Sequence, residues 1–137
     1  MRRKIEQLFL QWKQNPDRKP LVVKGCRQCG KTYSVLSFAR ANYEHVIYLN
    51  FHEQPSYKKF FQGALDVQTI TMLISAAFPS IPIVPGKTCF VLDEIQECPR
   101  ARTALKFFKL DGRYDVLCTG SLVGVNGYRN DLEDMEA

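Results

Sequence analysis

Residues 25–32 read Gly25-Cys26-Arg27-Gln28-Cys29-Gly30-Lys31-Thr32, a complete match to the pattern G-x-x-x-x-G-K-[ST]. Glycines let such a loop turn tightly, so that successive backbone N–H groups point at one phosphate group. We expect Lys31 to reach the β- and γ-phosphates of a nucleotide and Thr32 to offer its hydroxyl to Mg²⁺. The predicted nucleotide-binding residues are Gly25, Cys26, Arg27, Gln28, Cys29, Gly30, Lys31, Thr32 and Tyr33.

The apolar residues on either side of this loop predict strands that alternate with helices. The predicted strands cover residues 21–23, 45–51, 89–92 and 116–118. The predicted helices lie around residues 5–12 and over 32–41, 66–78 and 99–111, with Asp66 as an N-cap. Residues 52–63 show no clear period. Apolar strands joined by helical crossovers favour a parallel sheet covered on both faces, with ligands at the carboxyl ends of its strands.

Two carboxylates, Asp93 and Glu94, come directly after the apolar run of residues 90–92. An aspartate at a strand tip is well placed to hold Mg²⁺ opposite Thr32, directly or through water. A glutamate that directly follows it can orient and polarise a water molecule for attack on the γ-phosphate. We therefore predict Thr32 and Asp93 as metal ligands, and Glu94 and Lys31 as catalytic residues.

The last predicted strand runs into Thr119-Gly120-Ser121. A hydroxyl at Thr119 or Ser121 would contact the γ-phosphate or the attacking water, and the same three residues also suit a simple turn. Cys26 and Cys29 form C-x-x-C, but both lie at variable positions of the phosphate loop and no second Cys or His pair accompanies them. This argues against a zinc or redox site.

Composition limits the class of protein. The 137 residues suit one domain, and 45% hydrophobic with 24% charged residues is typical of a globular chain. The net charge of +5 suits anionic partners, and a solvated helix face explains it equally well. An odd count of five cysteines, no secretory signal and no membrane-length apolar run predict a cytoplasmic protein with no membrane contact.

Several segments together resemble a prokaryotic family of AAA-superfamily ATPases. These are the phosphate loop with its Arg27-Gln28 pair, Tyr48-Leu49-Asn50-Phe51, Leu92-Asp93-Glu94-Ile95-Gln96-Glu97-Cys98-Pro99 and Thr119-Gly120-Ser121. The resemblance implies an α/β, three-layer P-loop NTPase fold of AAA/RecA-like type, with Walker A and Walker B motifs. It implies Mg²⁺-dependent ATP hydrolysis, with family roles for Lys31, Thr32, Asp93, Glu94 and Ser121. It also implies that the fourth strand lies between the first and third, which places Thr119 near Lys31 and Asp93.

The resemblance covers about residues 1–125, which we take as the ATPase core, and leaves residues 126–137 as a polar tail. Members of the family continue with a fifth strand, a helical lid and a C-terminal domain often described as nuclease-like. The chain is therefore expected to be truncated before the last strand and the lid, and no arginine finger is evident. We expect slow hydrolysis by the chain alone and turnover in an intact parent protein.

Other functions are less consistent with the residues. A GTPase needs an [NT]-K-x-D motif, and Phe108 precedes Lys109-Leu110-Asp111 where Asn or Thr is required. A small-molecule kinase is disfavoured because Glu94, by activating water, would waste its ATP. A nucleotide-binding interaction module without efficient hydrolysis remains the alternative to an ATPase. The sequence leaves open a macromolecular partner, protein or nucleic acid, and oligomerisation.

Overall fold

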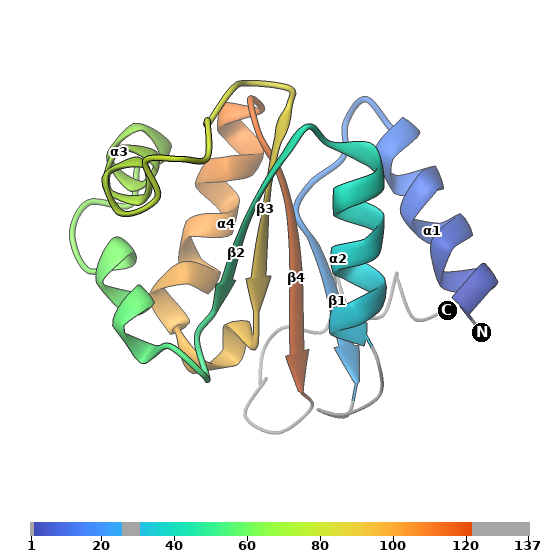
Figure 1. The fold of residues 1–137 in the computed structure, drawn as a ribbon, viewed down its shortest axis with the longest axis horizontal. Helices are drawn as coiled ribbons and strands as arrows, with labels where there is room; N and C mark the ends of the chain where they lie inside the picture. The colour runs from blue at the N-terminus through green and yellow to red at the C-terminus, as the bar shows by residue number, and fades with distance from the viewer. Residues whose placement is uncertain (1, 26–30, 122–137) are drawn as a thin grey trace.

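The structure, a computed structural model, describes residues 2–25 and 31–121. In this part of the chain four strands form one parallel sheet in the order β1-β4-β3-β2. The strands are β1 (Leu21–Gly25), β2 (His45–Asn50), β3 (Thr88–Asp93) and β4 (Asp115–Ser121). All four arrowheads point to the same end of the molecule (Figure 1). The predicted α/β fold with a parallel sheet is confirmed.

Helices cover both faces of the sheet and make it the middle of three layers. One face packs on α1 (Arg2–Gln14) and α2 (Lys31–Asn42) through a core that includes Phe9, Val35 and Leu117. The other face carries the remaining helical elements and the larger core. These elements are η1 (Pro55–Phe61), α3 (Val67–Ala77), η2 (Ile95–Glu97) and α4 (Pro99–Asp111).

Single residues explain where α3 and α4 begin and where α4 ends. Asp66 caps α3, as predicted, because its carboxylate accepts a hydrogen bond from the backbone N–H of Thr69 at 2.9 Å. Proline stands at the first position of α4, where no intrahelical N–H is needed. Gly112 ends α4 with φ 76° and donates its N–H to the carbonyl of Phe108 at 3.0 Å.

The structure decides two segments that the sequence leaves open. Residues 52–63, which show no clear period, contain the 3₁₀ helix η1, whose Phe60 and Phe61 are buried. Thr119, Gly120 and Ser121 belong to β4 and do not form a turn. The reason is the ladder with β1, which continues through the pairs Lys24–Gly120 and Gly25–Ser121.

The position of β4 agrees with the order that the resemblance implies. It lies between β1 and β3, with Val23 opposite Thr119 and Leu92 opposite Cys118. Both β1, which leads into the phosphate loop, and β3, which ends in Asp93, therefore pair with β4. Residues 26–30 and the tail at 126–137 lie outside the described residues. None of the described helices has both the length and the apolar character that a membrane span requires.

Candidate nucleotide and magnesium site

The predicted site residues gather where the strands end. β1 ends at Gly25, β3 at Asp93 and β4 at Ser121, and these strands are neighbours in the sheet. Gly25 and Ser121 face each other in the ladder, so the first glycine of the phosphate loop lies beside the last residue of β4. Parallel strands bring their carboxyl ends to one edge, which is why residues far apart in sequence meet there.

Thr32 and Asp93, the two predicted metal ligands, are in contact. The Thr32 hydroxyl lies 3.1 Å from each carboxylate oxygen of Asp93. α2 begins at Lys31, so Thr32 occupies the first helical turn and faces the tip of β3. The Asp93 side chain is 1% exposed. The structure therefore brings the predicted pair together from segments separated by 61 positions.

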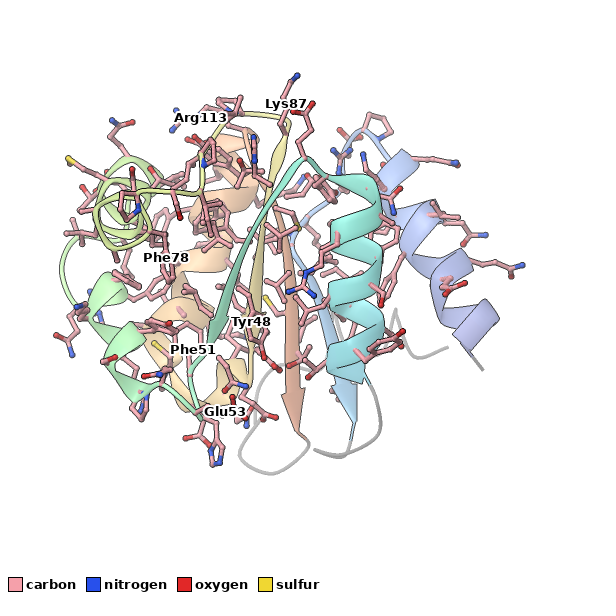
Figure 2. All side chains as sticks on the ribbon, in the orientation of Figure 1. Tyr48, Phe51, Glu53, Phe78, Lys87 and Arg113 are labelled. Carbon is pink, nitrogen blue, oxygen red and sulfur yellow. The ribbon has the colours of Figure 1, made fainter. Side chains whose placement is uncertain are left out.

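Asp93 accepts further hydrogen bonds from three side chains. The phenol of Tyr48 donates to Oδ2 at 2.5 Å and the amide of Asn50 donates to the same oxygen at 3.2 Å. Thr119 donates its hydroxyl proton to Oδ1. These donors compensate for taking a carboxylate out of water. Figure 2 places Tyr48 on the same half of the molecule as Phe51 and Glu53, away from Lys87 and Arg113.

Tyr48 stays a proton donor in this position. Burial, and next the hydrogen bond to the Asp93 carboxylate, raise the pKa of its phenol well above the ordinary value. Asn50 also donates to the phenol oxygen at 3.2 Å. The phenol, the amide and the carboxylate therefore form one connected network at the tips of β2 and β3.

The chemistry of these donors fits Mg²⁺. A hydroxyl and a carboxylate are hard oxygen ligands, and Mg²⁺ usually takes one or two such groups together with water and substrate phosphates. No group of three or more His, Cys, Asp or Glu side chains able to hold a metal occurs among residues 2–25 and 31–121. Thr32 and Asp93 are therefore the kind of ligands that Mg²⁺ takes when it is shared with a nucleotide.

Glu94 has an unusual backbone. Its φ of 59° and ψ of 51° lie in the left-handed region, and no other non-glycine residue in the described part has positive φ. Its N–H donates to the Thr119 hydroxyl oxygen at 3.0 Å, and its carboxylate accepts from the Gln96 amide at 2.8 Å. The side chain is 5% exposed. Left-handed non-glycine residues cluster at functional sites, where the surrounding structure holds them.

Thr119 connects the two acidic residues. Its hydroxyl donates to Asp93 and accepts from the backbone of Glu94, and the residue is fully buried. The single hydroxyl proton of Thr119 is therefore directed at Asp93. Ser121 has a described backbone position beside Gly25, but its side chain lies outside what the structure describes.

The remaining predicted residues are known only in part. Residues 26–30 lie outside the described residues, and for Lys31 only the backbone position at the start of α2 is described. Tyr33 lies in the first turn of α2 with 60% of its side chain exposed.

Three side chains of the site had no assigned role in the sequence analysis: Tyr48, Asn50 and Gln96. A partial signal existed for the first two, because residues two apart in a strand share a face. Which residues that face meets depends on the register with β3, in which Asn50 is the partner of Asp93. For Gln96 there was none, because its contact depends on the backbone turn at Glu94.

The chain resembles known proteins in family and fold. A family model described as an AAA domain matches residues 17–127. The search of curated proteins found no match.

Similar solved structures include PCH-2 of C. elegans, with 18% identity and a TM-score of 0.50 over 98% of this chain and 39% of that chain. A Walker-type ATPase of Pyrococcus abyssi shows 12% identity and a TM-score of 0.50 over 88% of this chain and 45% of that chain. AMPPCP-bound DnaA from Aquifex aeolicus shows 13% identity and a TM-score of 0.50 over 89% of this chain and 40% of that chain. At these identities the likeness shows the fold alone, and the chain spans less than half of each structure.

Proposed function

This chain belongs to the AAA domain family, and from this we propose that it is an ATP-binding domain that takes ATP with Mg²⁺ and supports hydrolysis in its intact parent protein. The observation that carries the proposal is the contact between Thr32 and Asp93 at 3.1 Å. It joins the residue that ends the phosphate-loop motif to the acidic tip of β3. This is the pairing that P-loop enzymes use to hold Mg²⁺.

Each residue of the site has a role in this proposal. The backbone N–H groups of residues 25–31 cradle the phosphates, and Lys31 adds its positive charge at the β- and γ-phosphates. Thr32 and Asp93 would hold Mg²⁺, which when bound neutralises charge on the phosphate oxygens. Tyr48, Asn50 and Thr119 fix the orientation of the Asp93 carboxylate through the hydrogen bonds described above.

Glu94 is the proposed general base. Its carboxylate orients the attacking water and accepts the proton that the water loses. Burial strengthens this polarisation, because the effective dielectric constant is lower than in water. Ser121 is the proposed γ-phosphate contact, since its backbone adjoins Gly25 and the Thr119 hydroxyl is directed at Asp93.

Nucleotide binding tests the proposal directly. The chain should bind a fluorescent ATP analogue in the presence of Mg²⁺, and Lys31→Ala should lose most of this binding. Charge-assisted hydrogen bonds are worth roughly 1.5–3 kcal/mol, so we expect affinity to fall about 10- to 100-fold. Fluorescence titration measures the dissociation constant with Mg²⁺ and with a chelator.

The matched control is Lys87→Ala. Lys87 pairs with Glu44 at 3.0 Å on the surface, at the end of the molecule opposite Glu53 in Figure 2. This variant removes the same charge from the whole molecule and should bind the analogue like the unmodified chain. Equal affinity of the Lys31→Ala variant and the unmodified chain would contradict the proposed site.

A further inference from the structure

Gln96 belongs to the segment that follows Asp93, and the proposed function so far gives it no role. The left-handed backbone of Glu94 turns the chain sharply out of β3 into the short helix η2. The Glu94 carbonyl accepts the N–H of Glu97 at 3.0 Å, which closes this turn. Residues 94 and 96 therefore lie on one tight turn, and the distance between their side chains does not depend on the movement of another element.

The side-chain amide of Gln96 holds the Glu94 carboxylate. Nε2 of Gln96 donates to Oε1 of Glu94 at 2.8 Å. A hydrogen bond from a side chain on the same turn restricts the rotation of the carboxylate. The Glu94 side chain is buried and Gln96 is partly buried, so water competes weakly for this bond.

Gly120 of β4 leaves the space in which the Gln96 amide sits. A Cβ atom added at Gly120 would lie 3.2 Å from Oε1 of Gln96, closer than ordinary van der Waals contact, and 3.7 Å from Cγ2 of Ile95. The backbone itself does not require glycine here, because Gly120 lies in a strand and the positive-φ glycines of the described part are Gly86 and Gly112. A glycine inside a strand often marks such a close approach.

We propose that Gln96 is a positioning residue for ATP hydrolysis: its amide holds the Glu94 carboxylate in the orientation from which it activates water, and Gly120 provides the room for that amide. This inference rests on the proposed function. Gln96 acts through Glu94 and does not itself touch the reacting atoms.

Single-turnover hydrolysis of ATP by the natural protein that contains this domain tests the effect on chemistry. Gln96→Ala should lower the rate about 10-fold or more, as part of the roughly 10²–10⁴ that general-base assistance contributes. The dissociation constant for the ATP analogue should change less than about twofold, because a positioning residue acts on the chemical step. Glu97→Ala, on the same turn, is the matched control and should keep the unmodified rate.

Two double variants separate positioning from a general structural role. If Gln96 acts through Glu94, then Gln96→Ala has no further effect in a Glu94→Gln background. Gly120→Ala should also slow hydrolysis, and it should add little to Gln96→Ala, because the side chain that its Cβ would meet is then gone. Additive losses in both pairs would overturn the proposal.

The contact itself is tested without nucleotide by NMR of this chain. The Gln96 side-chain NH₂ signals are identified by their loss in Gln96→Ala, and the signal of the bonded proton should move upfield in Glu94→Ala. Unchanged signals would overturn the proposal.

The hydrolysis rates also distinguish a failure of the role proposed for Gln96 from a failure of the proposed function. If Glu94→Gln slows hydrolysis and Gln96→Ala does not, the role of Gln96 is rejected and the proposed function stands. A normal rate in Glu94→Gln rejects the proposed role of Glu94, and the role of Gln96 falls with it.

Discussion

At the scale of single residues, Asp93 accepts hydrogen bonds from four side chains. Thr32, Tyr48, Asn50 and Thr119 all donate to its two oxygens. A carboxylate offers about four lone-pair sites, so these donors determine the orientation of the group closely. In the proposed function this carboxylate is a preorganised metal ligand, and its neighbours would contribute without touching the nucleotide.

Tyr48→Phe tests this network. The substitution removes the O–H that donates to Asp93 at 2.5 Å and keeps the ring. We expect the free energy of unfolding to fall by about 1–3 kcal/mol, because a buried carboxylate oxygen loses a charge-assisted hydrogen bond. Urea denaturation measures the change. Tyr57→Phe is the control, since the Tyr57 ring stacks on Phe60 and should lose no more than about 0.5 kcal/mol. Equal stability of the Tyr48→Phe variant and the unmodified chain would contradict the network.

At the scale of elements, the residues at the two ends of α4 explain where this helix begins and where it ends. Proline opens it and Gly112 closes it in the left-handed region. Its buried residues Ala101, Ala104, Leu105 and Phe108 recur at helical spacing and pack under the sheet. This helix leads through residues 112–114 into β4, whose register with β3 places Thr119 beside Asp93.

Gly112→Ala should destabilise the protein through backbone conformation alone. A Cβ at Gly112 would meet nothing within 4 Å, but φ is 76°. The left-handed region costs a residue with a Cβ about 1–2 kcal/mol, so we expect a loss of that size in chemical denaturation. Gly63→Ala is the matched control, because its Cβ also meets open space and no left-handed φ is required there. If both variants lost stability equally, the conformational explanation would be wrong.

At the scale of the whole molecule, the two ends of the sheet differ in the residues that gather there. The carboxyl end gathers the site, while the opposite end is tied together by Asp115. This carboxylate accepts from Arg18 at 2.9 Å and from the phenol of Tyr43. Burial, and next the bond to Asp115, raise the pKa of Tyr43 far above its ordinary value, so the phenol remains protonated. At this end the segments that follow α1 and α2 are therefore tied to the first residue of β4, and the candidate site lies at the other end.

The rate of hydrolysis is a property of the complete protein. We expect the 137-residue chain alone to hydrolyse ATP slowly or undetectably, because phosphoryl-transfer enzymes gain about 10³–10⁵ in rate from an arginine finger that another segment or another subunit supplies. An intact parent protein should turn ATP over, and Glu94→Gln should slow it about 10²–10⁴-fold. Phosphate release, measured for both lengths with and without the substitution, checks this. A parent protein as fast with Glu94→Gln as without it would disprove the role of Glu94.

Local patterns in the amino-acid sequence predict the alternation of strands and helices, the helix caps, and Thr32 with Asp93 as a metal-ligand pair. These features are local: apolar periodicity, Asp66, Pro99 and Gly112 act within a few positions, and the G-x-x-x-x-G-K-[ST] pattern implies its own strand–loop–helix context. Asp93 was found because it stands at the end of an apolar run. The central place of β4 came from the family resemblance, and the register of the sheet agrees with it.

Which side chains support that pair depends on how separate segments pack in the folded chain. Tyr48 and Asn50 reach Asp93 because β2 and β3 pair in one particular register, and register is a property of two strands that no single segment encodes. The contact of Gln96 with Glu94 depends on a left-handed residue that propensity disfavours, and its space depends on Gly120 of a distant strand. Packing of separate segments selects these contacts, so they appear only when the chain is folded.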